Sequence, residues 1–260
     1  MKIGTFVRAT GIGLILLFAV APILVLILAA FDEGRFFRFP PRGLSMRWFI
    51  AAFESAEYRA SVTRSVVVAS LATVISVGLG GLAALGLVRG RPPGQAYLEA
   101  LILAPLALPL VVWAIAFLQV LSYSGLGGTL FGLILAHVII TLPIAMRVIL
   151  ATFTRIDPDL EAAARSLGAT PVRAFLRTTL PLARGGIAGA AALSFLVSFN
   201  DVVVSTFVAG AGWVTFPVRL YAQLRGEGID PITLAIGAMI VGVIIVGAIA
   251  TELWPRRRGR

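Results

Sequence analysis

Long apolar stretches constrain this chain more than any other feature of its sequence. Crossing about 30 Å of hydrocarbon takes about 20 apolar residues in a helix that rises about 1.5 Å per residue. Six stretches reach that length, at residues 11–30, 65–88, 96–121, 129–149, 185–209 and 231–250. With 59% hydrophobic residues, the chain carries more apolar surface than one water-facing core can hide. The sequence therefore predicts an all-α membrane protein with six transmembrane helices, forming a single domain over residues 1–260.

The first apolar stretch has two features of a secretory signal peptide. It follows Lys2 and Arg8, and its end at Leu28-Ala29-Ala30 resembles a cleavage site. Its apolar run is longer than the core of about 7–15 residues in such peptides. We therefore predict that it is retained as the first span.

The distribution of Lys and Arg predicts the orientation in the membrane. Cytoplasmic loops of membrane proteins carry an excess of these residues. If the amino terminus is cytoplasmic, the segments on that side hold 14 of the 22, and the segments 31–64 and 210–230 hold the other 8. Both termini are therefore predicted to be cytoplasmic, with the basic tail 256–260 at the membrane surface. Topology explains the net charge of +10, and nucleic acid is not expected as a partner.

The composition also excludes several kinds of site. Without cysteine there are no disulfides, thiolate zinc sites or cysteine nucleophiles, and a single His cannot build a histidine metal cage. The chain has no Gly-x-x-x-x-Gly-Lys-Ser/Thr loop for nucleotide phosphates, and no cofactor is predicted. The segment 31–64, the largest on the outer face, has room for a short interfacial helix near 45–53 but not for a binding domain. A module that captures a soluble substrate must be another chain.

The cytoplasmic connection 155–184 is predicted to form two short helices. Asp157 is a good N-cap, and Pro158 suits the first helical position because its missing N–H would have no partner there. Gly168 suits the left-handed position that ends a helix. Thr170 starts a second helix in the same way, again followed by proline, and Pro181 marks the return to the membrane.

One narrow face of the first predicted loop helix is apolar. Spacing of i, i+3, i+4 and i+7 brings together Leu160, Ala163, Ala164 and Leu167. Small alanines on this face would let another backbone approach closely, as in docking to the groove of a partner protein. An amphipathic helix resting on lipid headgroups has the same pattern. The pattern alone leaves both interpretations open.

The loop resembles the EAA loop of binding-protein-dependent ABC importer permeases. The resemblance lies in DPDLEAAARSLGA at 157–169, followed by Leu180-Pro181, and extends to the segments 43–49 and 198–207. In one respect the chain departs from the motif, because Ala162 stands where the family usually has Glu, and Glu161 precedes it. The resemblance implies that the ATPase-coupling residues are Leu160, Glu161, Ala162, Ala163, Ala164, Leu167, Gly168 and Pro181.

The resemblance also implies a set of partners and a mechanism. Two permease subunits form the pathway in the bacterial inner membrane, an ATPase dimer docks under their loops, and an external solute-binding protein delivers the substrate. Within the family the chain resembles the second permeases of spermidine/putrescine importers, a subgroup that also contains transporters of other small solutes. This resemblance implies a different partner permease and favours a small, polyamine-like solute. ATP binding would move the helix 158–167 and switch access, and the chain itself would not be an enzyme.

Asn200 and Asp201 lie within the fifth apolar stretch. An ionised carboxylate there costs about 2.5–3.5 kcal/mol on insertion scales, so it should face the bundle or an aqueous cavity. On one interpretation both residues line the translocation pathway, where an acid would attract a cationic solute. On the other, Asp201 pairs with a neighbouring helix or caps a local break in this span.

Other intramembrane residues are interpreted first as structural. His137 is expected to form hydrogen bonds between helices. Pro105, Pro109 and Pro143 each remove a backbone donor and kink a helix, which would serve packing first and hinge motion second.

Two other functions would account for part of the sequence. A stand-alone secondary transporter or channel would explain six spans and Asp201 without partners, but it leaves the capped loop unexplained. A membrane enzyme would need a cluster of acids and histidines or a nucleophile with its base. The acids Asp157, Asp159 and Glu161 crowd onto a short helix with no His nearby, so the sequence does not favour an enzyme.

Overall fold

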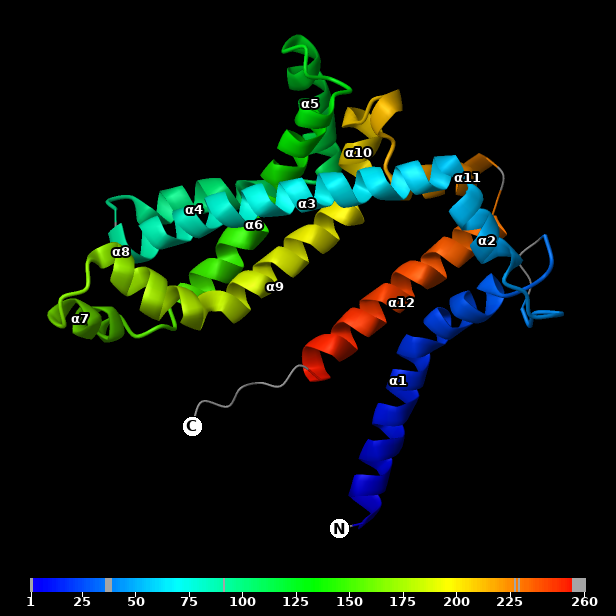
Figure 1. Cartoon of the computed structure of the whole chain (residues 1–260), viewed down its shortest axis with the longest axis horizontal. Helices are drawn as coiled ribbons and strands as arrows, with labels where there is room; N and C mark the ends of the chain where they lie inside the picture. Colours follow the sequence, from blue (N-terminus) through cyan, green and yellow to red (C-terminus); the bar gives the residue numbers. More distant parts are fainter. Residues whose placement is uncertain (1, 36–38, 91, 227, 229, 254–260) are drawn as a thin grey trace. The chain divides into compact units, whose positions relative to one another are not determined.

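The computed structural model describes residues 2–35, 39–90, 92–226, 228 and 230–253 (Figure 1). The chain divides into two compact units, one built from the two ends, Met1–Ala60 and Leu220–Arg260, and the other from Ser61–Arg219. The regular structure of the described residues is helical, apart from an isolated bridge between Asp32 and Leu44. The all-α prediction is confirmed, whereas a single domain over the whole chain stays a prediction. Arg91 and the predicted basic tail 256–260 lie outside the described residues.

The terminal unit is a small helical assembly. Its elements are α1 (Lys2–Ala30), α2 (Arg47–Glu54), the start of α3 (Ala56–Leu85), the end of α11 (Phe216–Gly226) and α12 (Pro231–Leu253). Helix α12 packs against both α1 and α2. The indole Nε1 of Trp48 donates to the carbonyl oxygens of Asp32 at 2.9 Å and Gly34 at 3.1 Å, which folds the segment after α1 onto α2. The short helix predicted near 45–53 is thus present as α2.

Polar side chains join three helix ends within the terminal unit. The Tyr58 hydroxyl at the start of α3 lies 3.0 Å from Asp230 Oδ2 and 3.1 Å from Thr233 Oγ1. Gln223 of α11 donates through Nε2 to Asp230 Oδ2 at 2.9 Å. Asp230 Oδ1 accepts from the N–H of Ile232 in the first turn of α12 at 2.9 Å. This cluster ties Asp230, which immediately precedes α12, to the start of α3.

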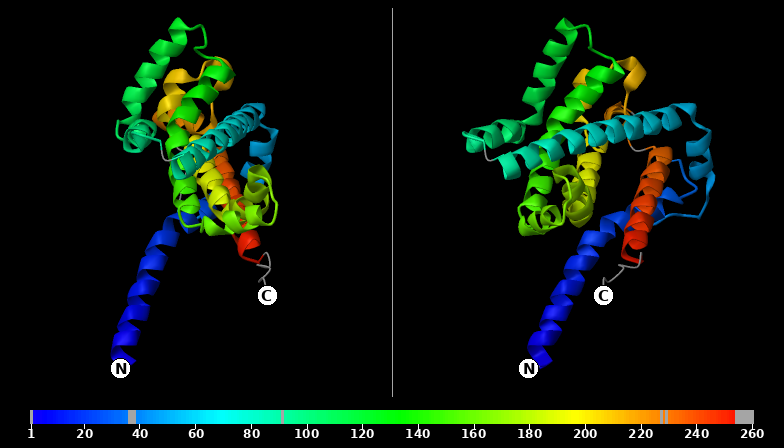
Figure 2. Two further views of the ribbon diagram at one scale, coloured as in Figure 1. Left: turned by 90° about the vertical axis from the view of Figure 1, so that its left-hand side faces the viewer. Right: turned by 60° about the vertical axis from the view of Figure 1, so that its left-hand side comes forward.

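The central unit is arranged around α6. Its elements are most of α3, η1 (Gly86–Gly90), α4 (Gln95–Leu103), η2 (Ala104–Leu106), α5 (Leu110–Tyr123), α6 (Leu130–Phe153), α7 (Asp159–Ser166), α8 (Pro171–Ala174), η3 (Phe175–Thr179), α9 (Leu180–Phe199), α10 (Val203–Val208), η4 (Ala211–Trp213) and the start of α11. Helices α6 and α9 pack side by side, and α10 packs on α5 and α6 (Figure 2).

Glycines allow the closest helix approaches in this unit. A Cβ on Gly80 of α3 would lie 2.8 Å from the backbone nitrogen of Met146 in α6. A Cβ on Gly186 of α9 would lie 2.7 Å from Cβ of Thr152 in α6 and overlap the rest of that side chain. Any larger residue at either position must move the two helices apart.

Four helices are long and apolar enough to cross a membrane: Thr10–Ala30, Ala56–Gly90, Leu130–Phe153 and Pro171–Phe199. The pair Gln95–Leu106 and Leu110–Tyr123 makes a fifth if it is counted as one span. The last predicted span falls in α12, of which the segment Pro231–Gly247 counts as a shorter apolar helix. The chain is therefore a multi-pass helical membrane protein. Six spans and two cytoplasmic termini stay predictions.

Two of the predicted spans are interrupted rather than continuous. The stretch 96–121 bends by 94° between η2 and α5. Pro109 is the last residue before α5 and is extended, with ψ of 135°, and a proline there cannot donate to the preceding turn. The stretch 185–209 divides at Asn200–Val202, between α9 and α10.

Candidate functional site

The predicted start of the loop helix is present in α7. Asp157 Oδ1 accepts from the backbone N–H of Asp159 at 3.0 Å, which satisfies one of the donors left open at a helix start. Pro158 precedes the helix with φ of −63°, an angle that its ring already imposes. The capping role of Asp157 is confirmed by this contact, whereas the helix begins one residue later than predicted, at Asp159 instead of Pro158.

The end of α7 has the hydrogen bonds of a Schellman motif. The N–H of Ala169 donates to the carbonyl of Ala164 at 3.1 Å, and the N–H of Gly168 donates to the carbonyl of Arg165 at 2.9 Å. Gly168 has φ of +91°, which strains any residue with a Cβ. A two-turn helix that is marginal by itself is therefore closed at both ends.

The apolar face of α7 points away from the rest of the described chain. Leu160 is 46% exposed and Leu167 is 91% exposed. Ala163 is also exposed, whereas Ala164 and Glu161 are half-buried on the inner side. Of the four apolar residues predicted to share a face, Leu160, Ala163 and Leu167 therefore point outward.

The second loop helix is not a separate element, in contrast to the prediction. Thr170 Oγ1 accepts from the N–H of Arg173 at 3.4 Å, so the predicted cap is present. From Pro171 the chain runs through α8, the π-helical η3 and α9 to Phe199 as one long helix. Pro181 lies in the first turn of α9 and does not end the helix. A proline removes only its own donor, and the wider turn of η3 just before it relieves the crowding.

A polar network lies beneath α7. Glu161 Oε1 accepts from the guanidinium of Arg89 in η1 and from the hydroxyl of Thr179 in η3. The Arg89 guanidinium also lies over the ring of Phe175, 4.9 Å from its centroid. Phe175 meets Phe153 of α6 edge-on, with ring centroids 6.3 Å apart. Sequence reasoning missed Arg89 and Thr179, although an arginine at the end of a span was a signal for an acidic partner.

A cleft of about 920 Å³ opens beside this network. Its walls come from the end of α3 with η1, from α4, and from the loop with α7. Charged side chains of both signs line it, among them Arg89, Glu99, Asp157, Glu161 and Arg165.

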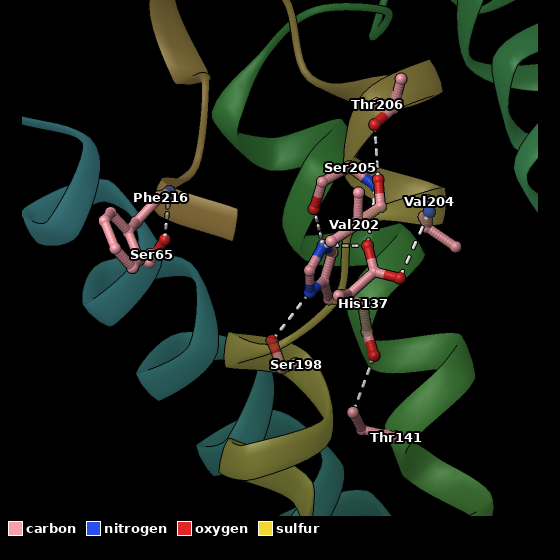
Figure 3. Close-up of polar contacts among 10 residues, drawn as sticks. Ser65, His137, Thr141, Ser198, Val202, Val204, Ser205, Thr206 and Phe216 are labelled. Carbon is pink, nitrogen blue, oxygen red and sulfur yellow. Dashed lines mark hydrogen bonds and ion pairs between the residues drawn. The ribbon is translucent and has the colours of Figure 1, made fainter. Parts of the chain in front are cut away.

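His137 of α6 bridges the two halves of the interrupted fifth stretch (Figure 3). Its Nδ1 lies 2.7 Å from the hydroxyl of Ser198, near the end of α9. Its Nε2 lies 3.0 Å from the hydroxyl of Ser205 in α10 and 3.8 Å from Asp201 Oδ2. All four side chains are buried. The predicted role of His137, hydrogen bonding between helices, matches these contacts.

Asp201 caps α10. Its Oδ1 accepts from the N–H of Val204 at 3.2 Å, and its Oδ2 accepts from the N–H of Ser205 at 2.7 Å. The residue is only 7% exposed. Asn200 is exposed and donates through Nδ2 to the carbonyl of Leu196 at 3.0 Å. Of the two interpretations of Asp201, the contacts support the cap, whereas a pathway role of either residue stays a prediction.

The three prolines lie in different settings. Pro105 and Pro109 flank the 94° bend, and the Pro105 carbonyl accepts from Trp113 Nε1 at 3.1 Å. Pro143 is buried within α6, which continues past it to Phe153. Their contribution to hinge motion stays a prediction.

Comparison with known proteins identifies the family. Residues 76–260 match the family described as binding-protein-dependent transport system inner membrane component. The chain belongs to this family. Its members are membrane-embedded permease subunits of ABC importers rather than enzymes, and the ATPase is a separate subunit.

Individual relatives of the permease cover most of its length. It is 26% identical over 252 residues to the spermidine/putrescine transport system permease protein PotC of Haemophilus influenzae, with 97% of each chain covered. It is 31% identical over 248 residues to the putrescine transport system permease protein PotI of Escherichia coli, covering 92% of this chain and 87% of PotI. A probable molybdenum ABC transporter permease protein of Haloferax volcanii is 32% identical over 206 residues, covering 75% and 76%.

A solved structure has the same fold as the permease. The crystal structure of a bacterial ABC transporter involved in the import of the acidic polysaccharide alginate superposes with a TM-score of 0.72. The match covers 98% of this chain and 97% of that chain, at 18% sequence identity. The ABC importer permease fold expected from the sequence is therefore confirmed.

Proposed function

We propose that this permease forms half of the translocation pathway of an ATP-driven importer in the bacterial inner membrane. It would cross the membrane six times with both termini in the cytoplasm, and α7 would dock on a separate ATPase. The single observation that carries this proposal is Leu167, 91% exposed at the end of a helix that is closed at both ends. A large apolar side chain held rigidly outside the apolar spans is suited to a partner's groove.

The partners follow from the family. The family description, binding-protein-dependent transport, supports an extracytoplasmic solute-binding protein as one partner. An ATPase dimer and a second permease subunit are the other partners that we propose. The similarity to PotC and PotI supports a second permease that differs from this chain. An interfacial position of α7 on lipid is the alternative for the same exposed face, and the experiment below separates the two.

The proposed substrate is a small solute of the polyamine type. The names of PotC and PotI support it, whereas the Haloferax relative carries the name of a molybdenum transporter. We propose that Asn200, exposed at the break between α9 and α10, faces the pathway. Asp201 would shape this break by capping α10, and its charge would act on a cationic solute only indirectly.

The docking proposal is tested by retention of the ATPase. The permease is co-expressed with the ATPase and second permease encoded beside it, and a tag on the permease is used for purification. Leu167→Arg and Ala163→Arg place a bulky charge on the exposed apolar face, and we expect both to lose the ATPase. Ser166→Arg is the matched control, because Ser166 is exposed on the same helix but outside that face.

Two outcomes would contradict the proposal. If the wild-type complex never retains an ATPase, a stand-alone transporter or channel becomes the better account. If Leu167→Arg retains the ATPase as well as Ser166→Arg does, α7 does not dock through this face.

Uptake of radiolabelled spermidine into proteoliposomes containing the whole complex, with radiolabelled molybdate in parallel, then tests the substrate class.

A further inference from the structure

We propose that Glu161, Arg89 and Thr179 form an internal link that ties the coupling helix α7 to two transmembrane helices. In this assignment Glu161 is a positioning residue inside the permease and not a contact to the ATPase. The proposal rests on the proposed function, since it says how a movement of α7 reaches the spans. It departs from the expectation, stated from the EAA motif, that the acid of the loop contacts the ATPase.

The direction of the Glu161 side chain is the first observation. It is 19% exposed, whereas Leu167 on the same helix is 91% exposed. Its carboxylate therefore points toward the body of the permease, and the outward face of α7 is left to apolar residues. Ala162, at the position where the family usually has Glu, is exposed and has no charge to offer.

The second observation is that one oxygen joins three elements. Glu161 Oε1 of α7 accepts from Arg89 of η1 and from Thr179 of η3. η1 continues α3, and η3 continues into α9, so both donors lie at the ends of long apolar helices. Charge-assisted hydrogen bonds are stronger and more directional than the apolar contacts around them. A displacement of α7 therefore acts on both helices at once.

The third observation is the geometry that holds Arg89 in place. Its guanidinium lies over the Phe175 ring, and Phe175 packs edge-on against Phe153 of α6. A planar cation on an aromatic face keeps its orientation toward Glu161 even though Arg89 is 38% exposed. The stacking also brings α6 into the same link.

Both donors come from π-helical segments, Gly86–Gly90 and Phe175–Thr179. A π turn places an extra residue in the helix and is frequently found at functional sites. Here the two π turns carry Arg89 and Thr179, which both reach Glu161 of α7, and Phe175, which lies under the Arg89 guanidinium. Two local irregularities that meet at the same carboxylate support a built link rather than a chance contact.

The experiment distinguishes a link inside the permease from a contact between Glu161 and the ATPase. Glu161→Gln, Arg89→Gln and Thr179→Val are introduced in the complete complex, and Arg165→Gln serves as the control. Arg165 lies on α7 beside the same cleft, and its side chain has no hydrogen bond or ion pair among the described residues. Three quantities are measured: ATPase retention, ATP hydrolysis, and uptake of radiolabelled spermidine.

We expect Glu161→Gln and Arg89→Gln to retain the ATPase and to hydrolyse ATP, with uptake per ATP hydrolysed lower by about tenfold. Thr179→Val should give a smaller loss, because Arg89 still holds the carboxylate. Exchanging the charges in the double variant Arg89→Glu with Glu161→Arg should restore part of the uptake, which a merely structural change would not do. Arg165→Gln should behave as wild type.

Two results would overturn the link. Loss of the ATPase in Glu161→Gln but not in Arg89→Gln would show that Glu161 contacts the ATPase, and the importer proposal would stand. Failure of the charge exchange, with both single variants folded, would show that the pair does not act together. A double-mutant cycle on thermal unfolding tests the link without the ATPase. The unfolding midpoint of the double variant Glu161→Gln with Arg89→Gln should fall no further than the midpoint of either single variant. Additive shifts contradict the link even if no ATPase is ever retained.

Discussion

Replacement of Asp201 by alanine tests how the break between α9 and α10 is held. The substitution removes both acceptors for the N–H groups of Val204 and Ser205. Each of these donors is then buried without a partner, at a cost of about 1–3 kcal/mol. Measured losses for helix caps are about 0.5–2 kcal/mol, because some donors find water or rotate. We therefore expect Asp201→Ala to lower the free energy of unfolding by about 2–4 kcal/mol.

This loss converts into a measurable shift of the unfolding temperature. A change of 1 kcal/mol shifts the midpoint by about 2–4 °C in a chain of this size, so about 5–15 °C is expected. The assay is thermal unfolding of the purified permease in detergent, followed by size-exclusion chromatography of the fraction that remains monodisperse. Asn200→Ala is the control, because Asn200 is exposed and its removal should change stability by less than about 0.5 kcal/mol.

Asp201→Asn distinguishes the cap from a charge in the pathway. Asparagine caps helices about as well as aspartate does and keeps one acceptor oxygen, so about half of the loss and normal uptake are expected. If Asp201→Asn is as stable as wild type but transports no spermidine, the carboxylate acts by its charge in the pathway. If Asp201→Ala unfolds at the wild-type temperature, the cap contributes nothing and the reasoning fails.

Three further predictions concern helix packing and one hydrogen-bonded side chain. Gly186→Val should prevent the permease from folding in the membrane, because the new side chain overlaps Thr152. Gly185→Val on the same helix meets open space and is the control, and the yields of monodisperse protein from the two variants are compared. Gly80→Val should separate α3 from α6 and lower the unfolding midpoint by about 4 °C or more, since overpacking costs about 1–3 kcal/mol; Gly78→Val is its control in the same thermal assay. Trp48→Phe should lose the hydrogen bond that the single indole N–H shares between two carbonyls, about 0.5–1.5 kcal/mol, and equal stability of the variant would refute this role.

The capped loop could be predicted from sequence because its signals are local. A carboxylate at Asp157 next to a proline, and a glycine at Gly168, act through the backbone within a few residues. Such interactions do not depend on what the rest of the chain does. The apolar spans are predictable for a related reason, since hydropathy depends only on composition within a window.

The breaks in the third and fifth stretches could not be located in this way. A hydropathy window sums side chains and does not register that Pro109 lacks a donor or that Asp201 offers two acceptors. Both signals were present in the sequence, but whether a proline kinks a span or starts a new helix depends on tertiary contacts. The same holds for α7, where the pattern gave an apolar face but not which side of the helix faces the protein.

The contacts of α9 connect the two polar sites of the central unit. One end of α9 is joined through Thr179, just before Leu180, to Glu161, and the other end through Ser198 to His137. Thr179 and Ser198 are 19 residue steps apart, which corresponds to about 28 Å of helix at about 1.5 Å per residue. Between them α9 packs on α6, and Ala183 and Ala190 of α9 share an apolar cluster with Ile149 of α6. If Glu161 ties α7 to η3 as proposed, a displacement of α7 would be passed along α9 to the break at Asn200, where access to the pathway would change.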